Sequence, residues 1–335
     1  MQQAHAPDQA IIRQHLAQTY AIEACTIEQI ERGNDPQAAL YLVQTSEQQY
    51  FLKLKHGSIY QAGVLLPRYL KDRGVAAVVA PVDTRTQQLW GRCQQFHSVL
   101  YPYIEGATGM DHGMSAQQWQ SFGQQLSRIH TMQVRPPLRH MLRWENFRPP
   151  WLPTVQAIQQ SINTWPIGDS YSAELIDFWR VKTREISYVI ERISELGNYL
   201  RVNARDFGLS HGDIHTANIV LDQIQQINIV DWDYPLFAPK ERDLRFVVGS
   251  VIGVPVQRHE EQWFFEGYGQ PTIDYKALAY YRYERVIQDL GDYAQRVLLR
   301  RDAPQTIKQA ALQSLRSRFL AGNIIESAYQ ADRAR

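Results

Sequence analysis

Hydrophobic residues in the first hundred positions fall into short segments separated by polar, turn-forming residues. Three segments are rich in β-branched and aromatic residues and predict strands: CTIEQI, ALYLVQT and QYFLKLK. Turn formers at 33–36 join the first pair, and Ser46 with Glu47 joins the second, so an antiparallel meander is expected. Before them, Pro7 and Asp8 mark a helix start, because apolar residues recur at helical spacing at positions 12, 16 and 20.

The pattern of short elements continues to about residue 104. A helix is expected over 60–73, where Gly74 ends the periodicity. Three further strands are expected at VAAVVAPV, QQLWGRC and HSVLYPYI. The segment YPYIEGATG then combines a proline with two glycines, which indicates a boundary. Residues 1–104 therefore predict a mostly antiparallel sheet with one or two helices.

Beyond this boundary the periodicity is mainly helical. Ser115 can cap one helix, residues 172–200 carry one long apolar stripe, and helical spacing returns over about 258–333. The proline-rich residues 133–153 predict a loop or an insertion. The strand signals of this half lie at 219–221 and 227–230, and the polar residues between them predict a small hairpin.

Length and composition limit the classes of function. A chain of 335 residues suits one large bilobal domain or two domains. A net charge of +1 gives no bulk attraction to nucleic acid or to an anionic membrane. The sequence shows no leader and no apolar run of membrane-spanning length, so we expect a cytoplasmic protein. Cys25 and Cys93 lack the spacing of a zinc site and are expected to be reduced thiols.

One polar loop, HGDIHTANIV at residues 211–220, leads directly into the predicted hairpin. Because a hairpin brings its two ends together, Asp213 and Asn218 should meet Asp231, which ends the second strand. Hard oxygen ligands from such residues suit Mg²⁺, and a carboxylate that does not bind the metal can accept a proton from a hydroxyl. Phosphoryl transfer needs these parts and little covalent chemistry from the protein.

Two other interpretations of this loop were weighed against phosphoryl transfer. An ordinary Asx-rich turn would account for HxD followed by asparagine. A zinc site at His211 and His215 would need a helix to bring positions i and i+4 together, whereas this segment lies between strands and contains Gly212. The second motif, an apolar segment that ends in Asp231 at hairpin distance, favours the phosphotransferase interpretation.

The segments HGDIHTANIV and INIVDWDYPLFAPKERDLRF resemble the aminoglycoside phosphotransferase and choline kinase-like family, most strongly its members that act on spectinomycin. YFLKLKHG, LYPYI, FFEGYG and YYRYERVIQD extend the resemblance from about residue 25 to about residue 295. It implies an α+β, protein kinase-like bilobal fold. Residues 1–104 would form an N-terminal nucleotide-binding lobe, and residues 105–335 a larger, mainly helical catalytic and substrate-binding lobe, with a hinge near 101–106.

The resemblance also implies roles for individual residues. Asp213 would be the catalytic carboxylate that orients the acceptor hydroxyl and takes its proton. Asn218 and Asp231 would hold Mg²⁺ between the β- and γ-phosphates. Lys53, in the segment YFLKLK, would reach the α- and β-phosphates as a point charge.

The hinge and the lysine's surroundings complete the implied nucleotide site. The carbonyl of Pro102 and the amide of Ile104 would meet the base of ATP or GTP. Two features depart from protein kinases. No GxGxxG motif is present, and residues 56–71 contain no acidic residue that could pair with Lys53. This lysine would therefore pair with a carboxylate from elsewhere, or be unpaired when no nucleotide is bound.

A cationic acceptor would need anionic, partly desolvated surroundings. Asp233 is the expected substrate contact, because on an extended chain it points to the same side as Asp231, two residues earlier. Further acidic residues follow the predicted metal site and recur on a later helix: Glu241, Asp243, Glu284, Asp289 and Asp292. Charges on one helix face are more often simply solvated, so Asp233 is the best single candidate.

Together these features predict a Mg²⁺-dependent kinase that transfers the γ-phosphate of ATP or GTP to a hydroxyl of a small cationic aminocyclitol or aminoglycoside, as in antibiotic resistance. We expect no nucleic-acid or membrane partner, and a monomer or weak dimer. Two alternatives stay open: a kinase of the same fold for choline, homoserine or a sugar, and a catalytically silent nucleotide-binding module. The missing acidic partner favours the silent module, whereas the intact set of predicted site residues argues against it.

Overall fold

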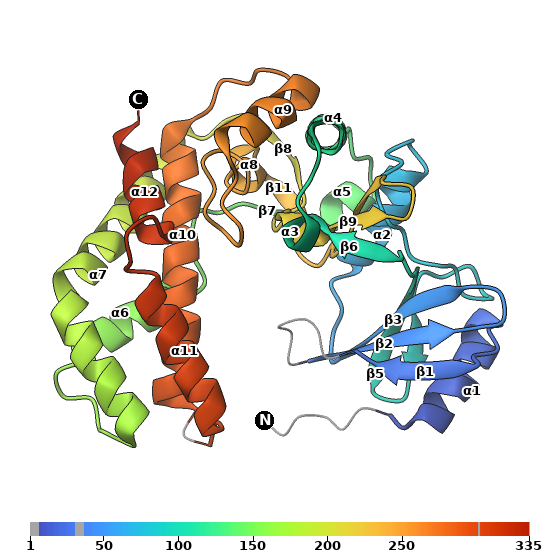
Figure 1. The fold of residues 1–335 in the computed structure, drawn as a ribbon, viewed down its shortest axis with the longest axis horizontal. Coiled ribbons are helices and arrows are strands. Elements are labelled where there is room, and N and C mark those ends of the chain that lie inside the picture. Colours follow the sequence, from blue (N-terminus) through green and yellow to red (C-terminus); the bar gives the residue numbers. More distant parts are fainter. Residues whose placement is uncertain (1–6, 31–36, 301, 335) are drawn as a thin grey trace. The chain divides into compact units, whose positions relative to one another are not determined.

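The computed structural model describes residues 7–30, 37–300 and 302–334 (Figure 1). Internal contacts divide the chain into two compact units. The first unit is formed by Met1–Arg143, His211–Leu236 and Trp263–Gly269, and the second by Trp144–Ser210, Phe237–Gln262 and Gln270–Arg335. Each unit is therefore assembled from three separate segments. The lobe boundary expected at residue 104 stays a prediction.

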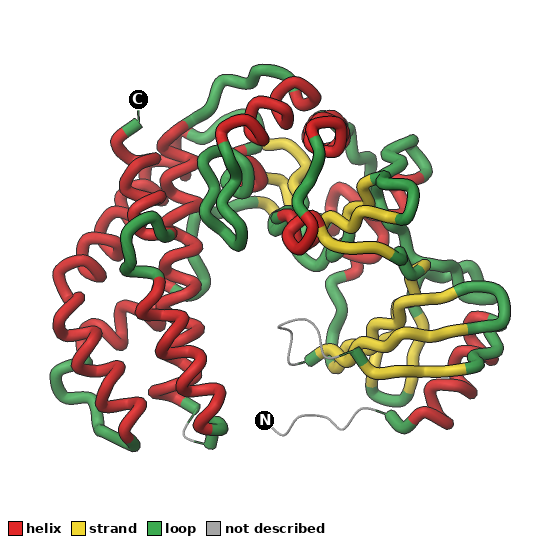
Figure 2. The backbone as a smooth tube through the Cα atoms, viewed as in Figure 1, coloured by secondary structure: helices red, strands yellow, loops and turns green. Residues whose placement is uncertain are grey.

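An antiparallel sheet forms much of the first unit (Figures 1 and 2). Its strands lie in the order β1 (Thr26–Gln29), β2 (Ala38–Gln44), β3 (Gln49–His56), β5 (Phe96–Pro102) and β4 (Gly91–Cys93). The register pairs Lys53 of β3 with Leu40 on one side and Val99 on the other. The predicted meander is therefore confirmed, because period-2 patterning and short turns are local signals. The turn expected at 33–36 lies outside the described residues.

One strand prediction in this region is wrong, and a second is confirmed only in part. Residues 75–82, VAAVVAPV, form no strand, and Val78 alone makes an isolated bridge, to Ile229. The backbone of this segment bonds instead to single residues of other elements, since the Val82 N–H donates to the Leu100 carbonyl at 2.7 Å. The segment QQLWGRC contributes only its last three residues, as β4. A short buried apolar run does not by itself distinguish a strand from an irregular segment.

Helix α1 (Gln9–Tyr20) covers one face of this sheet. The Asp8 side chain accepts hydrogen bonds from the first-turn N–H groups and starts the helix as expected. Ile12 and Leu16 of the helix are fully buried in one cluster with Leu52 and Leu54 of β3. Because side chains alternate along a strand, Lys53 points to the opposite face of the sheet.

Helix α2 (Gln61–Lys71) packs on the face of the sheet that carries Lys53. Val64 of this helix is buried against Val99 of β5, the strand neighbour of Lys53. Gly74, with φ of 81°, follows the helix, as the sequence predicts. Helix α2 therefore lies on the same side of the sheet as Lys53. The helix itself contains no acidic residue.

The predicted hairpin is present and belongs to a three-stranded sheet. Strands β9 (Ile219–Asp222) and β10 (Ile227–Ile229) pair antiparallel, and β6 (Gly106–Thr108) adds to the far edge of β9. The Asp222 carboxylate closes the turn by accepting from the N–H groups of Ile224 at 3.1 Å and Gln226 at 2.8 Å. Strand β6 falls in the segment expected to be a boundary, and it is too short for periodicity to reveal it.

The other helices of the first unit follow β6. They are α3 (Gly109–His112), α4 (Ala116–His130) and α5 (Leu138–Met141). Ser115 starts α4 with a full capping box, in which its hydroxyl accepts from the Gln118 N–H and the Gln118 side chain accepts from the Ser115 N–H. The last residues of α9 (Arg258–Tyr268) also belong to this unit, and the His130 ring is hydrogen-bonded to the Tyr268 hydroxyl.

The second unit is mainly helical. Its helices are α6 (Leu152–Ser161), α7 (Ser170–Asn203), α8 (Glu241–Leu244), α10 (Tyr275–Ala294), the π-helical turn η2 (Gln295–Leu299), α11 (Gln305–Ser317) and α12 (Ile324–Arg333). Short strands form one further sheet, in the order β7 (Arg143–Trp144), β11 (Leu236–Pro239) and β8 (Phe207–Ser210). The long helix expected over 172–200 is confirmed as α7. Within the described residues, no helix combines the length and apolar character needed to cross a bilayer.

A buried hydrogen-bond network lies between α1 and β5. His15 Nε2 lies 2.7 Å from Ser98 Oγ, and the Tyr20 hydroxyl donates to the Ser98 carbonyl at 2.9 Å. Thr19 Oγ1 lies 3.1 Å from the other ring nitrogen of His15. Burial lowers the pKa of His15 from its ordinary value, because the charged imidazolium loses solvation.

The lowered pKa of His15 predicts a loss of stability in acid. Above the unfolded-state value of about 6.5 the ring is neutral in both states, so the network is intact. Below it the unfolded chain takes up the proton first, and the free energy of unfolding falls until the folded-state pKa is reached. Urea unfolding between pH 7.5 and 5 should show a smaller fall for His15→Gln than for the wild type. Parallel pH curves for the two proteins would contradict this.

Candidate active site

The loop at residues 211–218 is held by a buried histidine. His211 has no exposed surface, and its Nδ1 accepts the Asp213 N–H at 3.3 Å. A backbone N–H can only donate, so the ring proton lies on Nε2, which donates to the Val230 carbonyl at 3.0 Å. The ring also contacts Trp232, with centroids 4.5 Å apart. One neutral side chain therefore fixes its own loop and the end of the hairpin together.

Asp213 is held through its backbone, and its carboxylate is partly accessible. Its carbonyl accepts from Asn218 Nδ2 at 2.8 Å and from the His215 N–H at 3.1 Å. The side chain is 35% exposed, and His215 Nε2 lies 3.7 Å from its Oδ2. A carboxylate with a fixed backbone and an accessible oxygen can accept a hydrogen bond, and then a proton, from a hydroxyl.

Asn218 and Asp231 lie at neighbouring positions, as the hairpin predicts. The Val230 N–H donates to the Asn218 carbonyl at 3.0 Å, so the next residue, Asp231, follows directly beside Asn218. Because Asn218 Nδ2 is engaged by the Asp213 carbonyl, its Oδ1 is the atom left to act as a ligand. A carboxylate and a carboxamide oxygen fit Mg²⁺, which prefers few protein oxygens and keeps positions for phosphate and water.

Asp231 has a backbone conformation that is uncommon for its residue type. Its φ is 64°, in the left-handed region, so the chain is not extended here as the sequence interpretation assumed. About half of the side chain is exposed, 49%, but protein atoms crowd around the carboxylate. This desolvation raises its pKa, whereas the Lys53 ammonium lowers it and the charges of Asp233 and Asp213 raise it further.

Lys53 forms ion pairs with two carboxylates that follow the hairpin. Its Nζ lies 2.5 Å from Asp233 Oδ2 and 3.7 Å from Asp231 Oδ1. The side chains of Lys53 and Asp233 are only 15% and 25% exposed. The acidic partner that the sequence lacks near α2 thus comes from 180 residues later in the chain. The role of Asp233 as a substrate contact stays a prediction, since the structure places it against the lysine.

This combination of a sheet lysine, an HxDxxxxN loop and an aspartate one hairpin later agrees with a comparison of the sequence with known families. The model of a phosphotransferase enzyme family matches residues 26–281. The chain belongs to this phosphotransferase family. Its members are enzymes that transfer phosphoryl groups, so the prediction of a phosphotransferase is confirmed at the level of the family.

Solved structures support the same assignment. The phosphotransferase is similar to spectinomycin phosphotransferase APH(9)-Ia in complex with ADP and spectinomycin, with a TM-score of 0.89 and 29% identity. This similarity covers 98% of the present chain and 100% of the other. Choline kinase LicA from Streptococcus pneumoniae matches over 92% of this chain and 99% of its own, with a TM-score of 0.57 and 17% identity, which shows the shared fold. The predicted kinase-like α+β fold and family resemblance are confirmed.

Among curated proteins, StrN of Streptomyces griseus is 27% identical to the phosphotransferase over 206 residues. The match covers 59% of this chain and 62% of the length of StrN.

Helix α2 contacts the backbone of the segment that carries the two aspartates. Gly63, in the first turn of α2, lies so close to the Trp232 carbonyl oxygen that a Cβ at this position would collide with it. Nearby, the Tyr60 hydroxyl donates to the Pro235 carbonyl at 3.0 Å. Sequence reasoning missed both residues. The one available signal was a glycine inside a predicted helix, which often marks a close approach of another backbone.

Tyr101 is a second neighbour of the aspartates that the sequence did not indicate. It pairs with Phe51 across β5 and β3 and is close enough to Asp233 and Asp231 for their charges to act on it. Burial raises the pKa of its hydroxyl, and the two carboxylates raise it further. The phenol therefore stays protonated beside them and can serve only as a neutral group.

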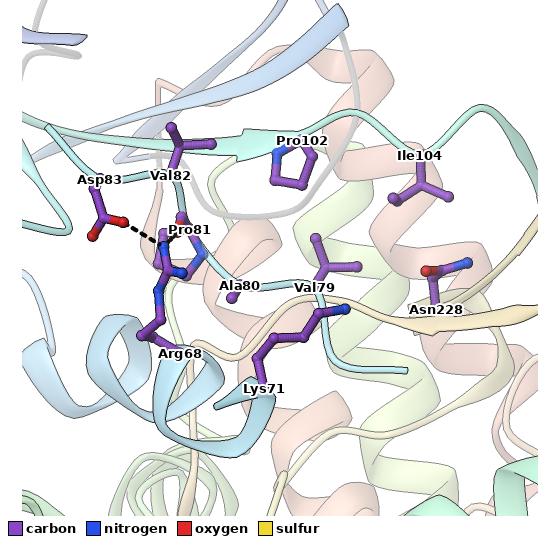
Figure 3. Close-up of a pocket in the computed structure, with 10 residues that line it drawn as sticks. All are labelled: Arg68, Lys71, Val79, Ala80, Pro81, Val82, Asp83, Pro102, Ile104 and Asn228. Atoms are coloured by element: carbon purple, nitrogen blue, oxygen red, sulfur yellow. Dashed lines mark hydrogen bonds and ion pairs between the residues drawn. The ribbon is translucent and has the colours of Figure 1, made fainter. Parts of the chain in front are cut away.

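The predicted hinge residues line a separate hollow. Pro102 and Ile104 face a cavity of about 320 Å³ whose floor is formed by residues 79–83 and whose sides carry Arg68, Lys71 and Asn228 (Figure 3). At one end of the cavity, Arg68 donates to Asp83 at 3.0 Å. Neither Lys53 nor Asp213 is among the lining residues that the structure describes.

The backbone register near Pro102 bears on the expected contact with a base. The Tyr103 N–H donates to the Gln49 carbonyl at 3.1 Å, so Pro102 and its partner Tyr50 form a non-hydrogen-bonded pair of the ladder. The Pro102 carbonyl therefore does not point toward β3. The contacts of Pro102 and Ile104 with a nucleotide base stay predictions.

The helical spacing of the later acidic residues suggested that they are simply solvated. The structure shows them in ion pairs or buried instead. Glu284 of the second unit accepts from Arg242 at 3.3 Å and Arg245 at 3.1 Å, and Arg242 also pairs with Glu145 at 2.6 Å. The remaining acidic residues of this group are paired or buried as well: Asp289 with Arg318, Asp292 with Arg296, Glu241 with Lys240, and Asp243 without exposed surface. Cationic side chains of the second unit therefore pair with Glu241, Glu284, Asp289 and Asp292.

The close approach at Gly63 predicts a destabilising Gly63→Ala substitution. Alanine in a helix is ordinarily favoured over glycine by about 1 kcal/mol. Here the added Cβ would displace the Trp232 carbonyl, so we expect a net loss of about 1–3 kcal/mol, as for other overpacked sites. Chemical denaturation measures the change. Gly168→Ala, where a Cβ has space, serves as the control. Equal or higher stability of Gly63→Ala would contradict the close approach.

Proposed function

We propose that this protein is a Mg²⁺-dependent phosphotransferase that moves the γ-phosphate of ATP, or of GTP, to a hydroxyl of a small cationic aminocyclitol or aminoglycoside. The observation that carries the proposal is the junction of the loop and the hairpin. There the accessible carboxylate of Asp213, the oxygen of Asn218 and the carboxylate of Asp231 are held together by His211.

Each residue has a defined part in the proposed reaction. Asn218 and Asp231 hold Mg²⁺, which when bound neutralises charge on the β- and γ-phosphates. Lys53 binds the α- and β-phosphates. The acceptor hydroxyl oxygen attacks the γ-phosphorus, the bond from the γ-phosphorus to the bridging oxygen breaks, and the nucleoside diphosphate leaves. The hydroxyl proton passes to the Asp213 carboxylate.

The nucleotide base is assigned to the hinge. The Pro102 carbonyl and the Ile104 N–H are proposed to meet its edge, and this contact needs no particular side chain. Support comes from the register that turns the Pro102 carbonyl away from β3. The similar spectinomycin phosphotransferase was solved with ADP in one structure and with AMP in another, which supports a nucleotide as the phosphoryl donor.

The acceptor is proposed from similarity. The similarity to an enzyme solved with spectinomycin extends over 98% of this chain at 29% identity, whereas the likeness to choline kinase, at 17%, speaks only for the fold. An aminocyclitol is therefore preferred over choline or a sugar.

A coupled assay of nucleoside diphosphate release tests the proposal directly. The panel contains spectinomycin, aminoglycosides, choline, homoserine and simple sugars, each with Mg-ATP and with Mg-GTP. We expect turnover with an aminocyclitol or aminoglycoside, and a fall of about 10²- to 10⁴-fold in kcat for Asp213→Ala, because the proton acceptor is lost. Nucleotide affinity should change little in this variant.

Other outcomes of the panel separate the alternatives. Turnover confined to choline, homoserine or a sugar would establish a metabolite kinase. Nucleotide binding without turnover on any acceptor would favour the silent module. Substantial residual turnover by Asp213→Ala would contradict its catalytic assignment, whichever acceptor is used.

The metal assignment has its own test. Asp231→Ala removes the carboxylate proposed to hold Mg²⁺, so we expect Mg-ADP to bind at least about tenfold more weakly, as for loss of one charged partner. Isothermal titration with and without Mg²⁺ measures the affinity. Binding of metal-free ADP should change less than binding of Mg-ADP, because the lost group acts through the metal. Identical titration curves for the wild type and Asp231→Ala would contradict the role.

A further inference from the structure

The protein's nucleotide lysine has its carboxylate partner in an unexpected part of the chain. In protein kinases the corresponding lysine pairs with a glutamate on the helix that follows its strand, and this pair is part of the active arrangement. Here Lys53 Nζ lies 2.5 Å from Asp233 Oδ2, and both side chains are largely buried. Asp233 lies two residues past the proposed metal ligand, Asp231.

Helix α2 cannot supply the usual partner. Its sequence, QAGVLLPRYLK, contains no acidic residue, and neither does the segment that leads into it from β3. The helix instead touches the backbone of the segment that carries Asp233. Gly63 meets the Trp232 carbonyl, and Tyr60 donates to the Pro235 carbonyl at 3.0 Å. The helix therefore supports the position of the acid without providing one.

Trp232 and Tyr234, the two residues next to Asp233 in sequence, each contact other parts of the first unit. The Trp232 side chain is buried, and its indole N–H donates to the Ile229 carbonyl at 3.3 Å. Gly212 lies so close to the Tyr234 carbonyl that a Cβ there would crowd it. A carboxylate between two anchored residues has few alternative positions. A lysine side chain, which has four rotatable bonds, loses much of its freedom when it pairs with such a group.

We infer that Asp233 is a positioning residue for the phosphoryl transfer, and that it holds Lys53 in place for the nucleotide phosphates in the role that a helix glutamate fills in protein kinases. This inference rests on the proposed nucleotide role of Lys53. Asp233 acts through the lysine, so its loss should have no effect where the lysine is already absent. A direct contact of Asp233 with the acceptor or the metal would act independently of Lys53.

A double-mutant cycle on nucleotide binding separates these possibilities. Isothermal titration with Mg-ADP compares the wild type, Asp233→Asn, Lys53→Met and the double variant. We expect Asp233→Asn alone to weaken binding by about tenfold, in the range of coupling between contacting groups. The double variant should then bind within about twofold of Lys53→Met. Multiplicative losses in the double variant would overturn the inference.

Steady-state kinetics provide a second readout that a merely structural role would not move. Asp233→Asn should raise the KM for nucleotide and lower kcat, and leave the KM for the acceptor unchanged. Asp233→Glu, which keeps the charge, should recover part of the loss. A raised acceptor KM with unchanged nucleotide affinity would overturn the inference and support the substrate contact expected from the sequence.

Controls separate folding from function. Glu47→Gln, an exposed carboxylate in the turn between β2 and β3, should bind Mg-ADP like the wild type. Circular dichroism and thermal unfolding confirm that each variant is folded. A folded wild type that binds no Mg-nucleotide would overturn the proposed function and this inference with it. Nucleotide binding with an additive cycle would overturn the inference alone.

Discussion

The hydrogen bond from the His211 imidazole to the Val230 carbonyl is the interaction on which the candidate site depends. It joins the loop that carries Asp213 to the segment after β10 that carries Asp231. The same ring accepts the Asp213 N–H, so one side chain fixes both pieces. A buried cation would have to be compensated by charge, whereas a neutral ring can be satisfied by hydrogen bonds to backbone groups.

The charges around this junction are uneven. The charges of Asp213 and Asp233 both act on Asp231, and the Lys53 ammonium faces Asp231 and Asp233. Burial raises the pKa of Asp231, the Lys53 ammonium opposes that rise, and the neighbouring acids add to it. Such a surplus of negative charge, with oxygens of two residues held side by side, is the setting in which a divalent cation binds most favourably.

Sequence reasoning succeeded where the signals are local. The meander around β3, the capped start of α1 and the hairpin of β9 and β10 each follow from periodicity and turn residues within one short segment. It failed at residues 75–82, where an apolar run is buried and makes only an isolated bridge, and at the short strands β6 and β7. Such elements are too short to show a period and depend on tertiary contacts.

The candidate site shows the same division. Its loop motif and terminal aspartate could be found because the hairpin that joins them is itself local. The partner of Lys53 could not be found, because it lies 180 residues away. The pairing of Glu284 with Arg242 and Arg245 was hidden for a similar reason, since helical spacing gives the face of a residue but not its neighbour.

The absence of an acidic residue from α2 has a consequence for how kinase-like sequences are sorted. A survey that infers catalytic activity from a glutamate on this helix would class the present chain as an inactive pseudoenzyme. Covariation between the strand lysine and the second residue after the hairpin aspartate, Asp231, would be a better criterion for such chains. In chains of this kind the carboxylate partner of the lysine belongs to the segment after the hairpin and not to the helix.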